Sequence, residues 1–308
     1  MPAPALLIVP YFGTFGPWFP LYLHSLSHQS TLDLLLVTDA PTPPLPSNVR
    51  RAEMTLADLR ALATDKLGVP VALMDTRKLC DLKPAYGLVF EDYVSGYEYW
   101  GFGDEDVLYG DLDRLLAPRF RSSPDIVTAG EDAPVGHFTL VRNVARATDL
   151  VLDDPEYHEV LADPAHWAYD EWSWAKEPDC GSFTKTVRRA EGSGKIVVSW
   201  DLPRRGDVPW IGDSYTYRDG SIWNHKGEEL AYYHWGRYRR EGYEFPSPEL
   251  AEEGFGFDRY GFYFLNEGSV QARIRKATGY ARYAGETAGK GVRRIGEAVG
   301  RRVRRAFS

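Results

Sequence analysis

The sequence predicts an α/β protein in which a mixed, mostly parallel sheet is flanked by helices. Two continuous apolar runs, residues 6–9 and 34–37, have the length of strands buried on both faces, as in a parallel sheet. Each run is followed by a segment of helical character, residues 19–27 after the first and 55–67 after the second. This alternation of strands and helices predicts ligand binding at the carboxyl ends of the strands.

The first two strands end in segments suited to a binding site. The first run stops at Pro10 and leads into the loop at residues 11–13. The second run ends at Thr38 and Asp39, before a proline-rich loop at residues 41–46. Because both loops follow parallel strands, we expect them to meet at one edge of the sheet.

Further elements follow in order along the chain. Thr55 and Asp58 have the spacing of a capping box, which predicts the start of a helix. Residues 84–93 are expected to be helical, and residues 99–102 form a strand that leads directly into the acidic triplet at residues 104–106. We expect a turn and then a helix at residues 107–116, strands at 126–128, 138–141, 196–200 and 230–235, and a loop or hairpin region at 203–224.

The charge of the chain is unevenly distributed. The net charge is −8, yet residues 270–308 hold eleven Lys and Arg against two Glu, which leaves −17 for residues 1–269. We therefore expect one domain at residues 1–269 and a separate basic tail at residues 270–308. The acidic domain argues against a nucleic-acid groove, because its surface would repel phosphates.

The sequence has no feature of a membrane-spanning or secreted protein. No apolar run reaches the length of a spanning helix, and no basic residue or cleavage site accompanies the apolar start. The two cysteines, Cys80 and Cys180, suggest neither a disulfide framework nor a zinc site. We expect a cytoplasmic protein.

Aromatic residues make up 14% of the chain, with 9 Trp and 19 Tyr. They suit either an aromatic-rich core or a cleft that stacks rings on sugar or base faces. Composition leaves both interpretations open.

The acidic triplet is the strongest functional signal. Asp104 and Asp106 are two positions apart after an apolar strand, so their side chains point to the same side of an extended backbone. Carboxylate oxygens suit Mg²⁺ or Mn²⁺, which can bridge a diphosphate and neutralise the charge on it. The alternative is a solvated acidic turn, because such short motifs are common.

Lys and Asp residues in the segment at 78–87 offer a second candidate site. A lysine there can bind phosphate while Asp81 accepts hydrogen bonds from hydroxyl groups. The alternative, which spacing alone favours slightly, is a solvent-exposed, salt-bridged helix start.

Two further motifs lie later in the chain. His234, after an aromatic strand, can complete a metal site begun by two carboxylates, and Arg237 would then lie close to the same diphosphate. A histidine beside a tryptophan is more often structural. Asp170 and Glu171 can orient or deprotonate an acceptor hydroxyl, or can cap a helix carrying the tryptophans around them.

Together these motifs resemble glycosyltransferases of the GT-A fold, and in particular an uncharacterised bacterial family of that fold. The resemblance is carried, in the expected order, by residues 8–13, 36–39, 78–87, 100–107 and 136–143.

The resemblance implies a site for a nucleoside diphosphate-sugar. It places Pro10, Tyr11 and Gly13 beside the nucleotide, and Thr38 and Asp39 near the base or ribose. It assigns donor contacts to Asp81 and Lys83, and also to Asp104, and metal contacts to Asp104 and Asp106, with a looser match at His234. Glu105 departs from the family, since many relatives carry a non-acidic residue there.

The basic tail predicts a membrane-surface helix. Residues 291–307 place apolar side chains on one helical stripe and arginines around much of the rest. Such a helix suits an anionic membrane. We therefore expect peripheral contact with the inner face of the membrane, where a saccharide or lipid-linked acceptor would lie.

The leading function is thus a Mn²⁺- or Mg²⁺-dependent glycosyltransferase of cell-surface polysaccharide or glycolipid synthesis, with Asp170 or Glu171 as the base if the reaction inverts configuration. Two alternatives stay open, a nucleotidyltransferase and a non-catalytic sugar- or membrane-binding protein. The first alternative is weakened because the loop at residues 11–16 lacks the basic residue expected there.

Overall fold

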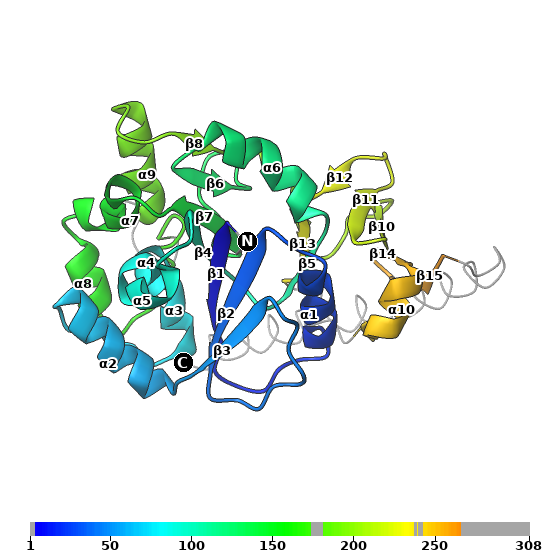
Figure 1. Cartoon of the computed structure of the whole chain (residues 1–308), viewed down its shortest axis with the longest axis horizontal. Helices are drawn as coiled ribbons and strands as arrows, with labels where there is room; N and C mark the ends of the chain where they lie inside the picture. The colour runs from blue at the N-terminus through cyan, green and yellow to red at the C-terminus, as the bar shows by residue number, and fades with distance from the viewer. Residues whose placement is uncertain (1–3, 174–180, 237–238, 240–242, 266–308) are drawn as a thin grey trace, which may run out of the picture.

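The centre of the fold is a sheet built from the apolar runs of the sequence (Figure 1). The computed structural model describes residues 4–173, 181–236, 239 and 243–265. In β1 (Ala5–Pro10) every residue except Pro10 is buried, and in β2 (Leu32–Thr38) every residue except Asp33 is buried. Strands of this kind need cover on both faces, which explains their lack of hydrophobic alternation.

Within the described chain, seven strands form this sheet in the order β3-β2-β1-β4-β7-β6-β8. The remaining strands are β3 (Val49–Glu53), β4 (Tyr99–Gly103), β6 (Ile126–Thr128), β7 (Phe138–Arg142) and β8 (Val198–Ser199). Four of the six neighbouring pairs are parallel, and β7 runs antiparallel to both β4 and β6. The predicted α/β fold with a mixed, mostly parallel sheet is confirmed.

Helical segments flank the sheet on both sides (Figure 1). Their bounds are α1 (Phe19–Ser27), α2 (Leu56–Leu67), η1 (Thr76–Lys78), α3 (Leu79–Leu82), η2 (Lys83–Ala85), α4 (Tyr86–Val89), α5 (Glu91–Val94), α6 (Leu112–Ser122), α7 (Ala145–Thr148), η3 (Asp149–Asp153), α8 (Tyr157–Ala162), α9 (Phe183–Gly192) and α10 (Pro248–Glu253). Thr55 and Asp58 form the predicted capping box at the start of α2.

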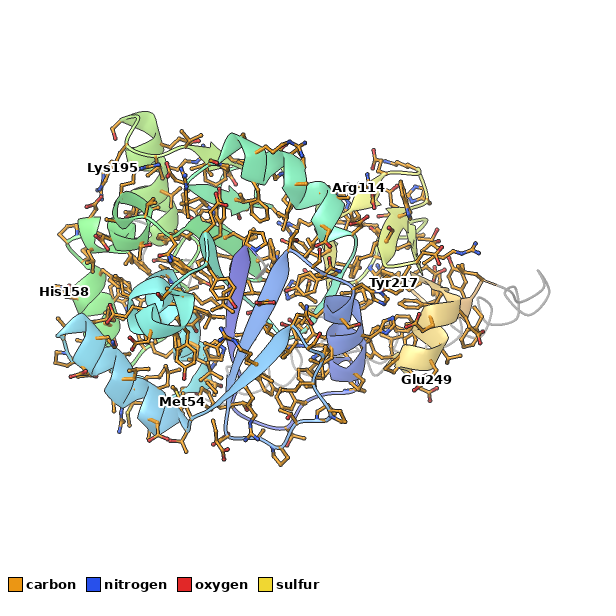
Figure 2. The ribbon with its side chains drawn as sticks, viewed as in Figure 1. Met54, Arg114, His158, Lys195, Tyr217 and Glu249 are labelled. Carbon is orange, nitrogen blue, oxygen red and sulfur yellow. The ribbon has the colours of Figure 1, made fainter. Side chains whose placement is uncertain are left out.

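Two apolar cores lie on opposite faces of the sheet. Leu6 and Ile8 belong to the core that includes residues of α2, α4 and α9, whereas Leu7 and Val9 belong to the core with residues of α1 and α6. This division follows from the strand geometry, because successive side chains point to opposite faces. Side chains fill the space between the sheet and its helices (Figure 2).

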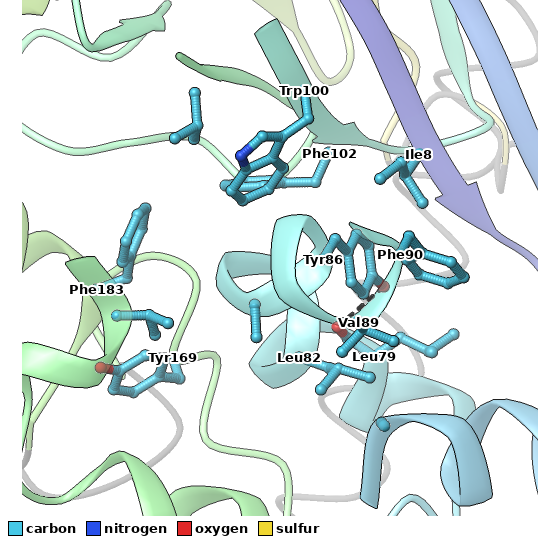
Figure 3. Close-up of a cluster of buried hydrophobic side chains, with 14 of the residues drawn as sticks. Ile8, Leu79, Leu82, Tyr86, Val89, Phe90, Trp100, Phe102, Tyr169 and Phe183 are labelled. Atoms are coloured by element: carbon cyan, nitrogen blue, oxygen red, sulfur yellow. Dashed lines mark hydrogen bonds between the residues drawn. The ribbon is translucent and has the colours of Figure 1, made fainter. Parts of the chain in front are cut away.

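Aromatic side chains close the gap between α4 and β4. Tyr86 and Phe90 lie beneath Trp100 and Phe102 in this core (Figure 3). A Cβ atom added at Gly87 would lie 2.3 Å from the Trp100 ring, so only glycine permits this approach of helix to strand. The close packing fixes the helical segment that carries Lys83 against the strand that precedes the acidic triplet.

Strands after residue 200 build two smaller sheets, one of which also includes an earlier strand of the chain. In the described residues, β5 (Val107–Tyr109), β13 (Tyr232–His234) and β9 (Arg204–Gly206) form one of them. The other has the order β12-β11-β10-β14-β15, with bounds β10 (Ser214–Arg218), β11 (Ser221–Asn224), β12 (Glu229–Leu230), β14 (Phe255–Asp258) and β15 (Gly261–Phe264). Their core is rich in aromatic residues, which accounts for part of the aromatic composition.

Several elements differ from the sequence prediction. The expected turn at 107–109 is strand β5, and the following helix continues to Ser122 through Pro118. The strand expected at 196–200 is reduced to β8, while the region at 203–224 contains β9 and the hairpin β10–β11. These elements are short, so hydrophobic periodicity gives them little signal.

No helix in the part of the chain that the structure describes is long and apolar enough to cross a bilayer. The basic tail at residues 270–308 lies outside the described residues, so its helix and its membrane contact stay predictions.

Candidate active site

The acidic triplet connects β4 to β5, and strand pairing brings His234 to it. β13 runs antiparallel to β5 and places His234 opposite Val107, directly after the triplet. The ligand atoms of Asp104, Asp106 and His234 all lie within 4.8 Å of one another. The Nε2 atom of His234 is 3.3 Å from Oδ1 of Asp106 and 4.0 Å from Oδ2 of Asp104. The three residues assigned to the metal from the sequence are thus adjacent.

The electrostatics of this cluster keep Asp106 ionised. Burial acts to raise the pKa of Asp106, but the hydrogen bond and charge of His234 and the charge of Arg239 hold that pKa below its ordinary value. For His234 burial acts to lower the pKa, and Asp106 more than reverses this. Oδ2 of Asp106 is buried and makes no hydrogen bond, although the guanidinium of Arg239 lies 3.1 Å from it.

Glu105, the middle residue of the triplet, does not join this cluster. Its Oε1 atom accepts a hydrogen bond of 2.8 Å from Arg239, and burial together with Asp106 and Asp104 raises its pKa to about 7. Two of the three carboxylates therefore belong to the candidate metal site, and the carboxylate of Glu105 pairs instead with the guanidinium of Arg239.

Arg239 is a site residue that sequence reasoning missed. Its Nη1 atom lies 3.1 Å from Oδ2 of Asp106, and its guanidinium is 5.1 Å from the centre of a Trp18 ring. The sequence prediction chose Arg237 for this cationic role, but Arg237 lies outside the described residues. The basic run at residues 237–240 was the available signal, and it does not by itself show which arginine faces the cleft.

His137 was also missed. Its ring stacks on His234 with centroids 4.4 Å apart, and burial keeps its pKa well below the ordinary value, so it is neutral at pH 7. A neutral ring behind His234 fixes the plane of that imidazole without adding a competing charge.

Lys83 connects the triplet to Asp170. The buried ammonium of Lys83 donates to Oδ1 of Asp104 at 2.7 Å and to the carbonyl oxygen of Gly136 at 2.9 Å, and it lies 3.6 Å from Oδ2 of Asp170. Burial acts to lower the pKa of Lys83, but the charge of Asp104 and its hydrogen bond to the ammonium help to raise that pKa well above its ordinary value. Lys83 is therefore a permanent cation of this cleft.

Asp170 is buried behind Lys83. Burial is the main cause that raises the pKa of its carboxyl to about 8. A Cβ atom at Gly136 would lie 2.3 Å from Oδ2 of Asp170, so a larger residue at that position would have to displace this carboxyl. Glu171 accepts a hydrogen bond of 3.1 Å from the Gly136 amide and lines a neighbouring cavity. Neither acid caps a helix carrying Trp172, because residues 169–172 form turns.

Asp81 requires a correction. It is fully buried, and its carboxylate oxygens accept hydrogen bonds from the amides of Trp167 and Tyr169 at 2.9 and 2.8 Å. The ammonium of Lys78 is 2.9 Å away. The expected donor contact is therefore wrong for this conformation: Asp81 ties the helical segment to the chain at residues 167–169. The salt-bridged helix start considered from spacing is present, although it is buried rather than exposed.

The residues expected at the nucleotide separate into two hollows. Pro10 and Tyr11 line a cleft of about 590 Å³ together with the triplet, Lys83, His234 and Arg239. Gly13 and Asp39 line a second hollow of about 660 Å³ beside it. The Tyr11 ring stacks on Phe15 of that hollow with centroids 4.8 Å apart, so these rings lie between the two.

Thr38 lines neither hollow. Its side chain is buried, and its hydroxyl oxygen accepts a hydrogen bond from the amide of Ala40 at 3.1 Å. The predicted contact of Thr38 with base or ribose is replaced by a role in shaping the turn that carries Asp39.

Comparison with known proteins places the chain in one family without an assigned activity. The model of a family of unknown function, DUF6625, matches residues 7–188, which is more than half of the chain. No curated protein matches it.

Three solved glycosyltransferase structures resemble the fold distantly. The chain is similar to residues 1–349 of TarS from S. aureus at 10% identity, with 77% of this chain and 62% of that chain covered and a TM-score of 0.32. For the galactosyltransferase LgtC in complex with donor and acceptor sugar analogues, the identity is 8%, the coverage 65% and 75%, and the TM-score 0.35. For GlyE of Streptococcus pneumoniae TIGR4 the identity is 10%, the coverage 68% and 69%, and the TM-score 0.27. At these TM-scores the resemblance does not assign an activity.

Proposed function

The chain belongs to DUF6625, a family of unknown function, and we propose that it is a metal-dependent glycosyltransferase of GT-A-like fold that uses a nucleoside diphosphate-sugar. One observation carries the proposal: two carboxylates and an imidazole converge in a cleft that also holds two fixed cations, Lys83 and Arg239. Metal ligands beside cations match the needs of a diphosphate, because its oxygens bind both.

The ligand set fits a divalent ion that accepts oxygen and nitrogen donors. Asp104 and Asp106 supply carboxylate oxygens and His234 supplies an imidazole nitrogen, which suits Mn²⁺, while Mg²⁺ prefers oxygen donors. The Oδ2 atom of Asp106 supports the fit, because it is buried and makes no hydrogen bond, and its ion pair with Arg239 is its one polar contact among the described residues. A bound ion would neutralise negative charge on the leaving diphosphate.

The protein's own residues supply the rest. Arg239 lies where it can bind a diphosphate oxygen, and the rings of Tyr11 and Trp18 line the same cleft. Lys83 holds Asp104 in place and keeps positive charge beneath the cleft. In this proposal Asp170 is a positioning residue for Lys83, because its carboxyl is buried and does not line the cleft. Glu171 is the carboxylate on the acceptor side.

A nucleotide panel tests the proposal. A thermal shift with UDP or GDP that appears with MnCl₂, together with release of the nucleoside diphosphate from one nucleotide-sugar, is the expected result. The membrane-associated acceptor predicted from the basic tail is tested separately by liposome co-sedimentation against a 1–269 truncation. Absence of any diphosphate-dependent shift, with or without Mn²⁺, contradicts the enzyme.

A further inference from the structure

Another cavity, the second cavity, lies beside the candidate metal cleft and is distinct from the hollow lined by Gly13 and Asp39. Its volume is about 650 Å³, within the range of small-molecule sites. It is lined by the loop at residues 129–135, by Glu171 and Trp172, and by residues 200–206. None of the residues that line the metal cleft lines this second cavity.

A single residue, Gly136, connects the two sites. The carbonyl oxygen of Gly136 accepts a hydrogen bond from Lys83, which lines the metal cleft, and its amide donates to Glu171, which lines the second cavity. On another side Gly206 of the second cavity pairs with His234 of the metal cleft. A molecule bound in the second cavity would therefore lie next to a donor bound at the metal cleft.

Trp172 offers an exposed ring to this cavity. The residue is 43% exposed, although it belongs to a tightly held turn. Ala168 and Ser173 bound that turn with φ values of 58° and 53°, which non-glycine residues rarely adopt, and the Ser173 amide donates to the Ala168 carbonyl at 2.9 Å. The turn thus presents a large apolar ring to solvent from a fixed backbone.

Trp200 gives the cavity a second, immobilised ring. The Arg188 guanidinium lies 4.6 Å from the ring centre, and the indole nitrogen donates to Glu191 at 2.8 Å. Arg188 also donates to the carbonyl oxygen of Asp132 at 2.9 Å. The same arginine therefore holds the ring and the loop at residues 129–135 together.

The charge of the lining indicates a neutral ligand. Four carboxylates contribute to it against two guanidinium groups; these residues are Glu131, Asp132, Glu171, Asp201, Arg204 and Arg205. An anionic diphosphate would be repelled by this balance. Carboxylates accept strong hydrogen bonds from hydroxyl groups, while an aromatic face packs against apolar surface. Hydroxyl groups around an apolar ring face are the chemistry of a sugar.

We propose that the second cavity binds a neutral saccharide, with Trp172 as the surface on which a sugar ring packs. Its identification as the acceptor site rests on the proposed function. In that reaction the acceptor hydroxyl oxygen bonds to the anomeric carbon of the donor, and the bond from that carbon to the diphosphate oxygen breaks. The diphosphate leaves with the electron pair, and the hydroxyl proton passes to the Glu171 carboxylate.

The binding test uses the full-length chain and an array of neutral di- to tetrasaccharides, followed by calorimetric titration of the strongest binder. Trp172→Ala is expected to weaken that binding at least tenfold, whereas Trp172→Phe, which keeps a ring, stays within about threefold. Trp223→Ala is the matched control, because Trp223 is 40% exposed and lies in β11, away from the cavity lining. It should bind like the unaltered protein.

Two results overturn the inference: no neutral saccharide binds the unaltered chain, or Trp172→Ala and Trp223→Ala bind it equally well. A Mn²⁺-dependent UDP or GDP shift is measured in parallel on the unaltered chain. If the nucleotide shift is observed and no saccharide binds, the saccharide site is contradicted and the proposed transferase is not. Trp172-dependent saccharide binding without any nucleotide shift defeats the transferase and leaves the cavity a saccharide site.

Discussion

The ammonium of Lys83 lies 2.7 Å from Oδ1 of Asp104, and the lysine side chain is only 6% exposed. Replacement by methionine leaves Asp104, Asp170 and the Gly136 carbonyl without their shared cation. We expect Lys83→Met to lower the free energy of unfolding by about 2 kcal/mol or more. Urea denaturation measures this change.

The surface pair of Lys66 and Glu91 is a matched control for that prediction. Its nitrogen and oxygen atoms are 2.6 Å apart, but Glu91 is 61% exposed. Lys66→Met should lower the free energy of unfolding much less than Lys83→Met, because exposed ion pairs contribute little. If Lys83→Met and Lys66→Met lowered the free energy of unfolding equally, burial of the Lys83 ion pair would not increase its contribution to stability.

Metal binding is expected to need Asp106 and His234. Asp106→Asn and His234→Ala should each weaken Mn²⁺ binding at least about tenfold, because each removes one of three ligand atoms. The free Mn²⁺ signal in electron paramagnetic resonance measures this without substrate. His24, His28 and Glu252 form another group able to hold a metal, so His28→Ala is the control. If His28→Ala alone abolished binding, the triplet would not be the site.

Arg239 should have opposite effects on the metal and the nucleotide. Its guanidinium is 3.1 Å from Oδ2 of Asp106, so it competes with a cation for that oxygen. Arg239→Ala is expected to tighten Mn²⁺ binding several-fold and to weaken UDP or GDP binding about tenfold, the scale of one charged hydrogen bond. Calorimetric titration gives both constants. Arg205→Ala, in the second cavity, should change neither, and a loss of both affinities in Arg239→Ala would contradict the competition.

The substitution Asp81→Asn distinguishes a structural role of Asp81 from a role in nucleotide binding. Asp81→Asn removes the charge opposite Lys78 and one of the acceptors for two backbone amides, so it should destabilise the fold by about 3 kcal/mol. The Mn²⁺-dependent nucleotide affinity of the folded fraction should stay within about twofold. A stable variant that had lost nucleotide affinity would restore the donor contact inferred from sequence.

Asp170 predicts a pH dependence of stability. Its pKa is raised to about 8 in the folded protein from an ordinary value of 3.8, chiefly by burial. The folded state therefore favours the protonated carboxyl, so the contribution of Asp170 to stability is full below pH 4 and is lost as the pH rises toward 8. One such group changes the free energy of unfolding by at most about 1.4 kcal/mol per pH unit.

Asp170→Asn cannot ionise, so its stability should fall less steeply than that of the unaltered protein between pH 4 and 8. Urea denaturation at intervals of one pH unit measures the two slopes. The exposed residue Asp65, replaced by asparagine, should leave the slope unchanged. Identical slopes for Asp170→Asn and the unaltered chain would mean that Asp170 is charged across this range.

The sequence predicted those parts of the fold whose residues are buried on both faces. The runs in β1 and β2 have no hydrophilic alternation, and the strand before the triplet is equally apolar. Strand β3 was missed because Arg50, Arg51 and Glu53 face solvent at the sheet edge, which leaves only two buried residues. Strand β5 has three residues, too few for a periodic signal, whereas β13 lies within the strand expected at residues 230–235.

The site was predicted as a set of residue types more successfully than as a set of contacts. Asp104, Asp106 and His234 are together because a strand pairing joins them, and no local pattern encodes that pairing. Asp81 and Lys83 are two positions apart, yet one pairs with Lys78 inside the core and the other with Asp104 in the cleft. Neighbours on a short helical segment point in different directions, and only packing decides which direction leads to the site.

Because β5 pairs with β13, the candidate site can be completed only late in the synthesis of the chain. Glu105 and Arg239 are hydrogen-bonded across 134 positions of the chain, so the cleft is complete only when the chain extends to residue 239. During translation the strands of the main sheet are synthesised before His234 and Arg239. A nascent or truncated chain would bury much of its core and still have an incomplete cleft. Nucleotide binding is therefore a readout of finished folding, which a measurement of secondary structure alone would miss.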